Sequence, residues 1–523
     1  MTALDPKRFR RLVLCVLLLC AVLSAARAEP PETANPGKNE ITSLDDLDGA
    51  DIGVQTGMIC DVLTQQRIPN TKIQYYNSQT DAMIALRTGK VKGWCCDEPV
   101  ARYILLSHPE MVILKEPLAK SDLAAVFPKT DAGSKLRDQY SAFVDRLWAD
   151  GTMARIDDLW FSTNEEKRTV LDYENLPDTN GTLHMAADTT IPPFAFVKDG
   201  RAVGYDIDVA ARFCEANGYR LEVTQMSFDS VLAAVQTGKC DFAASCITYT
   251  DERAESMLFS TPDYHGGVVM TVLKDPSAVL PESTSFWEGI AASFDKTFIR
   301  EERWQLFAKG ILTSLVITLL SILCGTVLGF GVYMLCRNGN RAANGVTRFC
   351  TWLVQGMPVV VLLMVLYYIV FGSVSVDGVF VAVVGFTLTF GSAVFGLLKM
   401  GVGTVDPGQY EAASALGFPG RTVFYRIVLP QALPHILPAY KNEIVTLIKA
   451  TAVVGYIAVQ DLTKVGDIVR SRTYEAFFPL VAVTIIYFLL EGLLAFLVGR
   501  IQIRVNPRRR KPEAILKGVN PHD

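Results

Sequence analysis

The sequence predicts a chain of two parts, an α/β part followed by an all-α part with five membrane spans. Charged residues are dense between Asp45 and Arg303 and sparse from Gly310 to Val498. Strand-like and helical periods alternate in the first stretch, and five long apolar runs fill the second. A water-exposed half followed by a membrane half explains both patterns.

The composition excludes several classes of protein. The 523 residues carry 50 Lys+Arg against 54 Asp+Glu, a net charge of −4, so no basic field indicates a nucleic-acid binder. Apolar residues make up 50% and charged residues 20%, with a mean hydropathy of +0.25. These values fit neither a disordered chain nor an ordinary soluble protein.

The first 28 residues have the pattern of a secretory signal peptide. Four basic residues precede the apolar run Leu12–Leu23, and Ala26-Arg27-Ala28 offers a small-x-small cleavage site. The alternative, an uncleaved anchor, is less favoured because the apolar run is short for a bilayer. The α/β half is therefore expected outside the cytoplasm.

The cysteines and histidines indicate neither a metal site nor a catalytic centre. Six cysteines fall in the exported half, without CxxC or Cys/His spacing: Cys60, Cys95, Cys96, Cys214, Cys240 and Cys246. Disulfides are permitted in that compartment, but the sequence does not give their pairing. The favoured interpretation is that most are small buried side chains. No cofactor is expected.

The exported half shows the alternation of an α/β lobe. Strand-like pieces are expected at Leu183–Ala187, Leu221–Gln225 and Phe242–Ser245, and helical periods at Ile207–Ala216 and Ser227–Thr237.

Five apolar stretches follow Trp304, and most are long enough to cross a bilayer. They cover residues 308–336, 350–371, 379–399, 436–458 and 476–499. Basic residues follow the first, third and fifth stretches, whereas the loop after the second has none. The positive-inside rule then places the amino end of this half outside and its carboxyl end inside, in agreement with the signal peptide.

The loop between the third and fourth stretches carries the sharpest motif, EAASALGFPGRTVFYRIVLP, from Glu411 to Pro430. Glu411 to Leu416 is helix-forming, and Gly417, Pro419 and Gly420 end that helix. A second short helix is expected to reach Leu429, before Pro430. Such a helix–turn–helix is compact enough to dock in a groove on a partner.

Glu411-Ala412-Ala413, Gly417 and the Ile-x-Leu-Pro ending resemble the EAA loop of ABC-transporter permeases, in the polar-amino-acid branch. The resemblance implies that these residues couple the chain to a cytoplasmic ABC ATPase subunit, and that permeases pair as a homodimer or heterodimer in membrane lipid. Gln355-Gly356-Met357-Pro358 departs from the Arg-Gly-Thr-Pro usual in that branch. No GxxxxGK[ST] loop occurs in the sequence, so ATP hydrolysis is expected on a separate polypeptide.

The exported half resembles the family-three solute-binding proteins, which are two-lobed α/β periplasmic binding proteins. Residues 183–275, with the signature run GYDIDV, resemble the first lobe. Residues 39–161, with SLDDLDGADIGVQTG, VKGWCCDEPVARYIL and LWADGTMARIDDLWF, resemble the second lobe and the closing helices. The order indicates a circular permutation, with 162–182 as an exposed linker between the old ends. The alternative is the remnant of a duplicated domain.

The resemblance also implies a ligand site. Arg253 of TDER would hold the ligand carboxylate, a role that suits its planar fork, and Asp97 of CCDEP would hold the ammonium. The remaining polar and wall positions are Thr248, Ser245, Cys246, Asp188 and Phe228. Each of these residues also has a purely structural alternative: an ion pair with Asp251 or Glu255 for Arg253, a strand-end cap for Asp97 and a core position for Phe228.

The resemblances together imply the membrane subunit of an ATP-driven ABC importer for polar amino acids, in a bacterial inner membrane, with its binding domain fused outside. An amino-acid-gated sensor or channel is one alternative, although a channel has no ATPase to dock. A dehydratase-like enzyme is another, and it would need Glu98 or Asp97 as an acid–base group.

Overall fold

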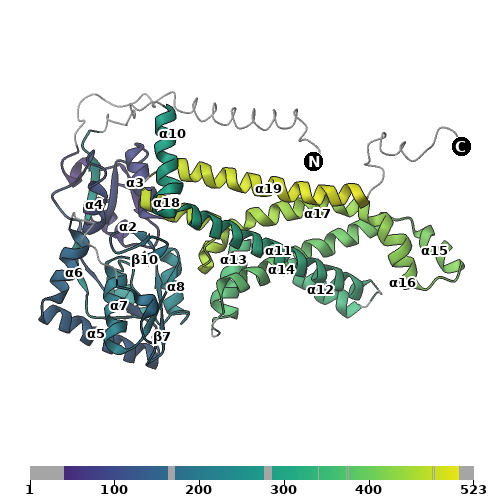
Figure 1. The fold of residues 1–523 in the computed structure, drawn as a ribbon, viewed down its shortest axis with the longest axis horizontal. Helices are drawn as coiled ribbons and strands as arrows, with labels where there is room; N and C mark the ends of the chain where they lie inside the picture. The colour runs from purple at the N-terminus through teal and green to yellow at the C-terminus, as the bar shows by residue number, and fades with distance from the viewer. Residues whose placement is uncertain are drawn as a thin grey trace.

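The computed structural model describes residues 41–162, 171–275 and 286–505, apart from positions 338, 340, 373, 375, 474 and 476. The signal peptide expected at 1–28 and residues 163–170 of the expected linker lie outside this range. An α/β domain stands at one end of the molecule, and long helices extend from it to the other end (Figure 1).

Lobe two is built on a six-stranded sheet with the order β2-β1-β3-β14-β4, in which β5 also pairs with β14. Its strands are β1 (Asp51–Gln55), β2 (Lys72–Tyr76), β3 (Gly93–Asp97), β4 (Met111–Ile113), β5 (Ala119–Leu123) and β14 (Tyr264–Leu273). Its helices are η1 (Leu44–Leu47), α2 (Cys60–Arg67), α3 (Gln79–Arg87) and α4 (Glu98–Leu105). β1, β2 and β3 are parallel, and β14 runs antiparallel to β3, β4 and β5.

Lobe one is built on a five-stranded sheet with the order β11-β7-β12-β6-β13 and a small sheet β10-β9-β8. Its strands are β6 (Val126–Phe127), β7 (Thr182–Ala187), β8 (Thr190–Ile191), β9 (Ala195–Lys198), β10 (Arg201–Val203), β11 (Arg220–Gln225), β12 (Phe242–Ala243) and β13 (Leu258–Phe259). Its helices are α5 (Asp131–Ala149), α6 (Thr152–Phe161), α7 (Tyr205–Asn217), α8 (Phe228–Gln236) and α9 (Asp251–Ser256). The strands and helices predicted here are confirmed, with β12 shorter than expected.

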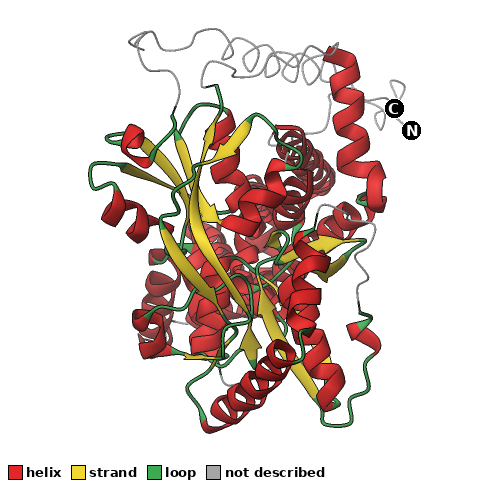
Figure 2. Cartoon of the chain, turned by 90° about the vertical axis from the view of Figure 1, so that its left-hand side faces the viewer, coloured by secondary structure: helices red, strands yellow, loops and turns green. Residues whose placement is uncertain are grey.

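Neither lobe is one continuous range of the sequence. The chain leaves the sheet of lobe two after β5 and enters that of lobe one at β6, and it returns between β13 and β14. Residues 126–161 therefore complete lobe one, and residues 264–273 complete lobe two. Figure 2 shows the strands of this domain, in yellow, on the side of the molecule that faces the viewer.

Aromatic packing explains why the early helices join the later strands. Tyr140 of α5 is fully buried, and its ring contacts Phe127, Phe213 and Phe242 at centroid distances of 5.0–5.8 Å. The buried Trp160 of α6 donates its indole N–H to Asp208 of α7 at 2.9 Å. Burying such rings stabilises the fold by about 1.5–3 kcal/mol each, so lobe one depends on both segments.

Most residues in the described part of the linker expected at 162–182 are exposed, but one of its side chains is buried. Residues Tyr173–Asn175 form the short helix η3, and Tyr173 is 3% exposed. Its hydroxyl donates to the Ala202 carbonyl at 2.8 Å, and the Arg201 guanidinium lies 5.2 Å from its ring centroid. The linker therefore packs onto lobe one, because an aromatic side chain within it finds an apolar surface there.

The helical part has three straight helices long and apolar enough to cross a membrane, within the described residues, and two bent pairs that could each form one more span. The straight helices are α11 (Trp304–Cys336), α14 (Gly378–Gly403) and α19 (Phe477–Val505). α11 and α14 pack closely, since a Cβ on Gly329 would lie 2.5 Å from the Gly391 carbonyl oxygen. Small residues at such contacts let two membrane helices approach.

The second predicted span, 350–371, is not one straight helix. α12 (Arg341–Gly356) ends before Pro358, and α13 (Val359–Met364) with η6 (Val365–Val370) continues at an angle of 109°. Pro358 lacks a backbone N–H and occupies the cap position of α13, so the chain turns there.

The predicted end of the second motif helix at Leu429 is also wrong. α15 (Pro407–Ala415) ends as expected, but α16 (Gly420–Val423) and η7 (Phe424–Val428) continue directly into α17 (Leu429–Ala450). Pro430 is the second residue of α17 and follows the π-helical η7 directly, so its missing N–H does not end the helix. Two short elements, η8 (Thr451–Ile457) and α18 (Leu462–Thr473), lie between α17 and α19. Three more precede α11: α10 (Phe286–Phe294), η4 (Asp295–Ile299) and η5 (Arg300–Glu302).

The interlaced lobes lead to a folding prediction. A soluble fragment of residues 29–285 should unfold in one cooperative transition, monitored by circular dichroism during urea titration. Tyr140→Ala should shift that whole transition by about 3–5 kcal/mol. Residues 183–275 alone should not fold, because they lack β6, α5 and α6. A cooperative transition in that short fragment would contradict the interdependence of the lobes.

Candidate functional site

Arg253 reaches from lobe one to lobe two. It lies in α9, whose amino end is capped by the Thr250 hydroxyl accepting from the Arg253 N–H at 3.2 Å. Its Nη1 donates to the Thr248 carbonyl at 2.8 Å, and its Nη2 donates to the Gly57 carbonyl of lobe two at 2.7 Å. Burial lowers the pKa of Arg253, and the charge of Asp97 opposes that shift. The hydrogen-bond partners of Arg253 are thus backbone carbonyls, and not the Asp251 or Glu255 carboxylates of the alternative surface ion pair.

Gly57 and Phe228 meet at the same place. Phe228 begins α8 in lobe one and is 1% exposed, and the Arg253 guanidinium lies 5.8 Å from its ring centroid. Gly57 has φ +85°, and an added Cβ would lie 3.3 Å from Phe228 Cδ1. Both the left-handed backbone and the close contact favour glycine here. Phe228 is thus buried at the boundary between the lobes.

Asp97 is a buried carboxylate at the carboxyl end of β3. It occupies the position before α4 but makes no side-chain cap hydrogen bond, and its Oδ1 has no hydrogen-bond partner among the described residues. Burial raises its pKa to about 6, against the opposing effects of the Cys246 thiol and Arg253. The cap interpretation therefore does not hold, and the carboxylate faces the groups of lobe one.

Asp188 and Ser245 lie together on the lobe-one side. The Ser245 hydroxyl accepts the Asp188 N–H at 2.9 Å, and Asp188 Oδ1 accepts the Thr190 hydroxyl at 2.7 Å. Asp188 Oδ2 accepts the amide of Gln55, from lobe two, at 3.1 Å. Thr248 makes a second contact between the lobes, since its Oγ1 lies 3.1 Å from Ser121 Oγ of β5.

Cys246 is held in an unusual backbone conformation. Its φ is +55°, and its N–H donates to Asp206 Oδ2 at 2.8 Å. Burial raises the pKa of Asp206 to about 7, and the neighbouring Asp97 adds to the shift. A strained residue beside buried carboxylates is typical of a functional site.

The structure thus brings all seven predicted ligand residues to the boundary between the lobes or next to it. Sequence reasoning missed Gln55, Ser121 and Asp206. Gln55 stands in GVQTG and Asp206 in GYDIDV, two runs that were read only as family signatures. Among the described residues, no group of three or more His, Cys, Asp or Glu could hold a metal ion.

The EAA-like hairpin, which consists of α15, α16 and η7, lies at the end of the molecule opposite the α/β domain (Figure 1). Glu411 and Ala412 are exposed on α15, whereas Ala413 is buried. Gly417 has φ +77° with open space around it, so the turn needs glycine for its backbone alone. Arg337, at the end of α11, donates to the Gly420 carbonyl at 3.2 Å and stacks on Phe424. The basic flank of the first span and the hairpin therefore lie together.

Comparisons with known proteins agree with this two-part architecture. The chain matches the bacterial extracellular solute-binding proteins, family 3, over residues 183–451, just over half its length. The helical part matches a Rickettsia typhi protein that carries the name glutamine transport system permease protein GlnP, at 32% identity over 37% of this chain and 90% of that protein. The arginine transport system permease protein ArtQ of Bacillus subtilis matches at 32% identity over 36% of this chain and 87% of that protein.

A crystal structure of an amino acid ABC transporter with histidines is also similar, at 25% identity over 42% of this chain and 99% of that chain, with a TM-score of 0.37. Fold and site define a binding-protein-like α/β domain joined to a helical permease-like region. The chain belongs to the family-3 bacterial extracellular solute-binding proteins, and its helical region is homologous to amino acid transport permeases.

The burial of the Asp97 carboxylate predicts that this residue lowers the stability of the folded domain at neutral pH. Its folded pKa of about 6 lies above the ordinary value of 3.8, so its contribution to stability is full below pH 4 and is lost as the pH rises through 6. Asp97→Asn should therefore stabilise the 29–285 fragment by up to about 3 kcal/mol at pH 7. The gain should disappear near pH 4, measured by urea titration at both pH values. Equal stability of the two proteins at pH 7 would contradict the burial argument.

Proposed function

We propose that the chain is the membrane subunit of an ATP-driven ABC importer for polar amino acids, with its receptor fused on the extracytoplasmic side. The observation that carries this proposal is the placement of two sites in one chain. A half-buried Arg253 of lobe one and a buried Asp97 of lobe two lie close enough to feel each other's charge at one end of the molecule, and the EAA-like hairpin lies at the other.

The spacing of the two ends supports a transmembrane arrangement. α11 starts at Trp304, beside the binding domain, and ends at Cys336, next to Arg337 and the hairpin. Its 33 residues extend about 50 Å, longer than the hydrocarbon core. Counting each bent helix pair as a span gives five spans. The binding domain then lies outside a bacterial inner membrane and the hairpin inside, where a separate ABC ATPase subunit docks.

The proposed ligand clamp uses charges of both lobes. The Arg253 fork takes the α-carboxylate in place of the backbone carbonyls, and Asp97 takes the α-ammonium. Ser245, Cys246, Thr248 and Asp188 add polar contacts, and Phe228 packs on the side chain. The names of the relatives mention glutamine and arginine, so these two amino acids are the first probes.

We also propose that the binding domain is circularly permuted. The order of the segments supports this proposal. Lobe two comes first in the sequence, β6, α5 and α6 precede β7–β13 although all of them belong to lobe one, and β14 then completes lobe two. The permutation places the end of β14 next in sequence to the membrane region. Two copies of the permease region, or one copy with a second permease, would complete the translocation path.

The clamp predicts the effect of removing Arg253. Arg253→Ala should weaken binding of L-glutamine or L-arginine to the 29–285 fragment by about 3–5 kcal/mol, at least roughly 100-fold, because a buried carboxylate loses its partner. Isothermal titration calorimetry measures the change. Arg155→Ala, an exposed arginine of lobe one, is the matched control. An unchanged affinity of Arg253→Ala for these amino acids would contradict the assignment of Arg253 as the carboxylate-binding residue.

The hairpin predicts a separate loss of coupling. Glu411→Lys, or Gly417→Asp at a left-handed φ, should leave amino acid binding intact while ATP-driven uptake falls at least roughly tenfold, because the hairpin docks the ATPase. Uptake and ATP hydrolysis are measured in vesicles that also contain the ATPase subunit. Gln409→Lys places a lysine at another exposed position of α15 and serves as the control. Normal uptake by both hairpin variants would show that this loop is not the docking element.

A further inference from the structure

Helix α18 of the permease region contacts both lobes of the binding domain. Its Arg470 forms an ion pair with Asp81 of α3, in lobe two, and both side chains are largely buried. Its Arg472 donates to the Tyr103 hydroxyl of α4, also in lobe two, at 3.1 Å. The same guanidinium lies 5.2 Å from the ring centroid of Phe196 in β9 of lobe one. One helix of the permease region therefore contacts groups of both lobes.

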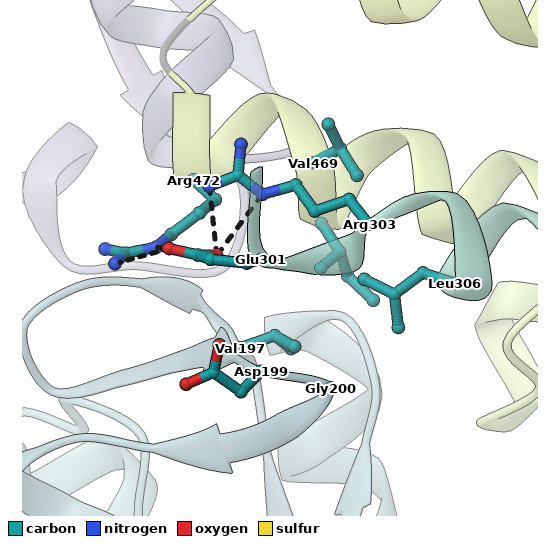
Figure 3. Close-up of a pocket in the computed structure, with 9 residues that line it drawn as sticks. Val197, Asp199, Gly200, Glu301, Arg303, Leu306, Val469 and Arg472 are labelled. Atoms are coloured by element: carbon teal, nitrogen blue, oxygen red, sulfur yellow. Dashed lines mark hydrogen bonds and ion pairs between the residues drawn. The ribbon is translucent and has the colours of Figure 1, made fainter. Parts of the chain in front are cut away.

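Arg472 is fixed by a buried charge cluster at the entrance to α11. Its Nη2 donates to Glu301 Oε1 at 3.1 Å, and Arg303 donates to Glu301 Oε2 at 2.9 Å. Figure 3 shows these three side chains above the β9–β10 turn, around a small pocket that Asp199 and Val197 also line. Glu301 has φ +54°, a conformation unfavourable for a residue with a side chain. Two arginines hold the chain in this bend.

Lobe one has further anchors of its own on the permease region. Lys239 donates to the Val374 carbonyl at 2.8 Å and to the Phe371 carbonyl, and its ammonium lies 4.9 Å from the Tyr367 ring. Ser230 of α8 donates to the Tyr456 carbonyl at 3.2 Å. Lobe one thus contacts the end of the second span and η8 as well as α18, whereas Asp81 and Tyr103 hold lobe two on α18.

α18 is also tightly packed against two straight helices. A Cβ on Gly310 of α11 would lie 3.0 Å from Val465 and 3.1 Å from Leu462 of α18. A Cβ on Gly466 of α18 would lie 2.6 Å from Val483 of α19. Close-packed elements transmit displacement because there is no free space to absorb it.

We infer that α18 transmits opening and closing of the ligand cleft to the membrane helices, a role that rests on the proposed importer function. When the distance between the lobes changes, lobe one stays on its own anchors. Lobe two then moves α18 through its contacts with Arg470 and Arg472. One permease region thereby senses both lobes of the domain fused to it.

Charge reversal tests this role in the full chain. The variants are Asp81→Arg, Arg470→Asp and the double exchange, and the matched control is Arg67→Ala, which removes an exposed ion pair with Glu116 in lobe two. The first readout, which needs no ligand, is hydrogen exchange of residues 296–303 and 462–473. The second is stimulation of ATP hydrolysis by L-glutamine or L-arginine in vesicles containing the ATPase subunit.

Each single reversal should raise exchange in both segments at least roughly tenfold, since a buried contact is lost, and should cut the stimulation several-fold. The double exchange should restore both readouts, and Arg67→Ala should change neither. Unchanged hydrogen exchange in Asp81→Arg would overturn the role of α18. So would raised hydrogen exchange in both segments together with undiminished stimulation of ATP hydrolysis. If the unmodified chain bound neither amino acid in calorimetry, the proposed substrate would fail instead, and the exchange measurement would still decide the docking.

Discussion

The chain crosses between the two lobes twice, and the rest of the binding domain depends on these crossings. β5 and β14 pair in the sheet of lobe two, while β6 and β13, which lie next to them in sequence, pair in the sheet of lobe one. Residues near the crossings therefore face the opposite lobe. Thr248 meets Ser121 there, and Arg253 reaches the Gly57 carbonyl. A small ligand between the lobes would be surrounded by groups whose spacing the crossings determine.

The position of β14 in the sequence has a consequence for the membrane region. In this chain the strand that completes lobe two, β14, is also the last strand before α10, η4 and α11. The binding-protein-like domain is therefore attached through lobe two, which α18 also contacts. A receptor held beside its permease works at a high effective concentration and does not depend on capture by diffusion. The buried cluster of Glu301, Arg303 and Arg472 makes this attachment a specific contact.

Much of the fold could be predicted because local signals and tertiary packing agree. Strand and helix periods gave β7, α7, β11 and α8, and hydropathy gave α11, α14 and α19. The sequence motifs around Arg253 and Asp97 predicted that both residues lie at the boundary between the two lobes. Local signals failed where a residue has two possible roles. Pro430 can end one helix or begin another, and Tyr173 lies in a polar stretch but is buried by a surface distant in sequence. The contacts of Arg470 and Arg472 were not predictable, because charges near a helix end give no partner until two domains are placed together.

The most direct test of the central claim is amino acid uptake by the chain without any added receptor. Purified chain and the ATPase subunit that copurifies with it would be placed in lipid vesicles, and entry of radiolabelled L-glutamine and L-arginine measured with and without ATP. A fused receptor and permease predict uptake that needs ATP but no separate binding protein. Uptake that required an added soluble binding protein, or that proceeded equally well without ATP, would contradict the account.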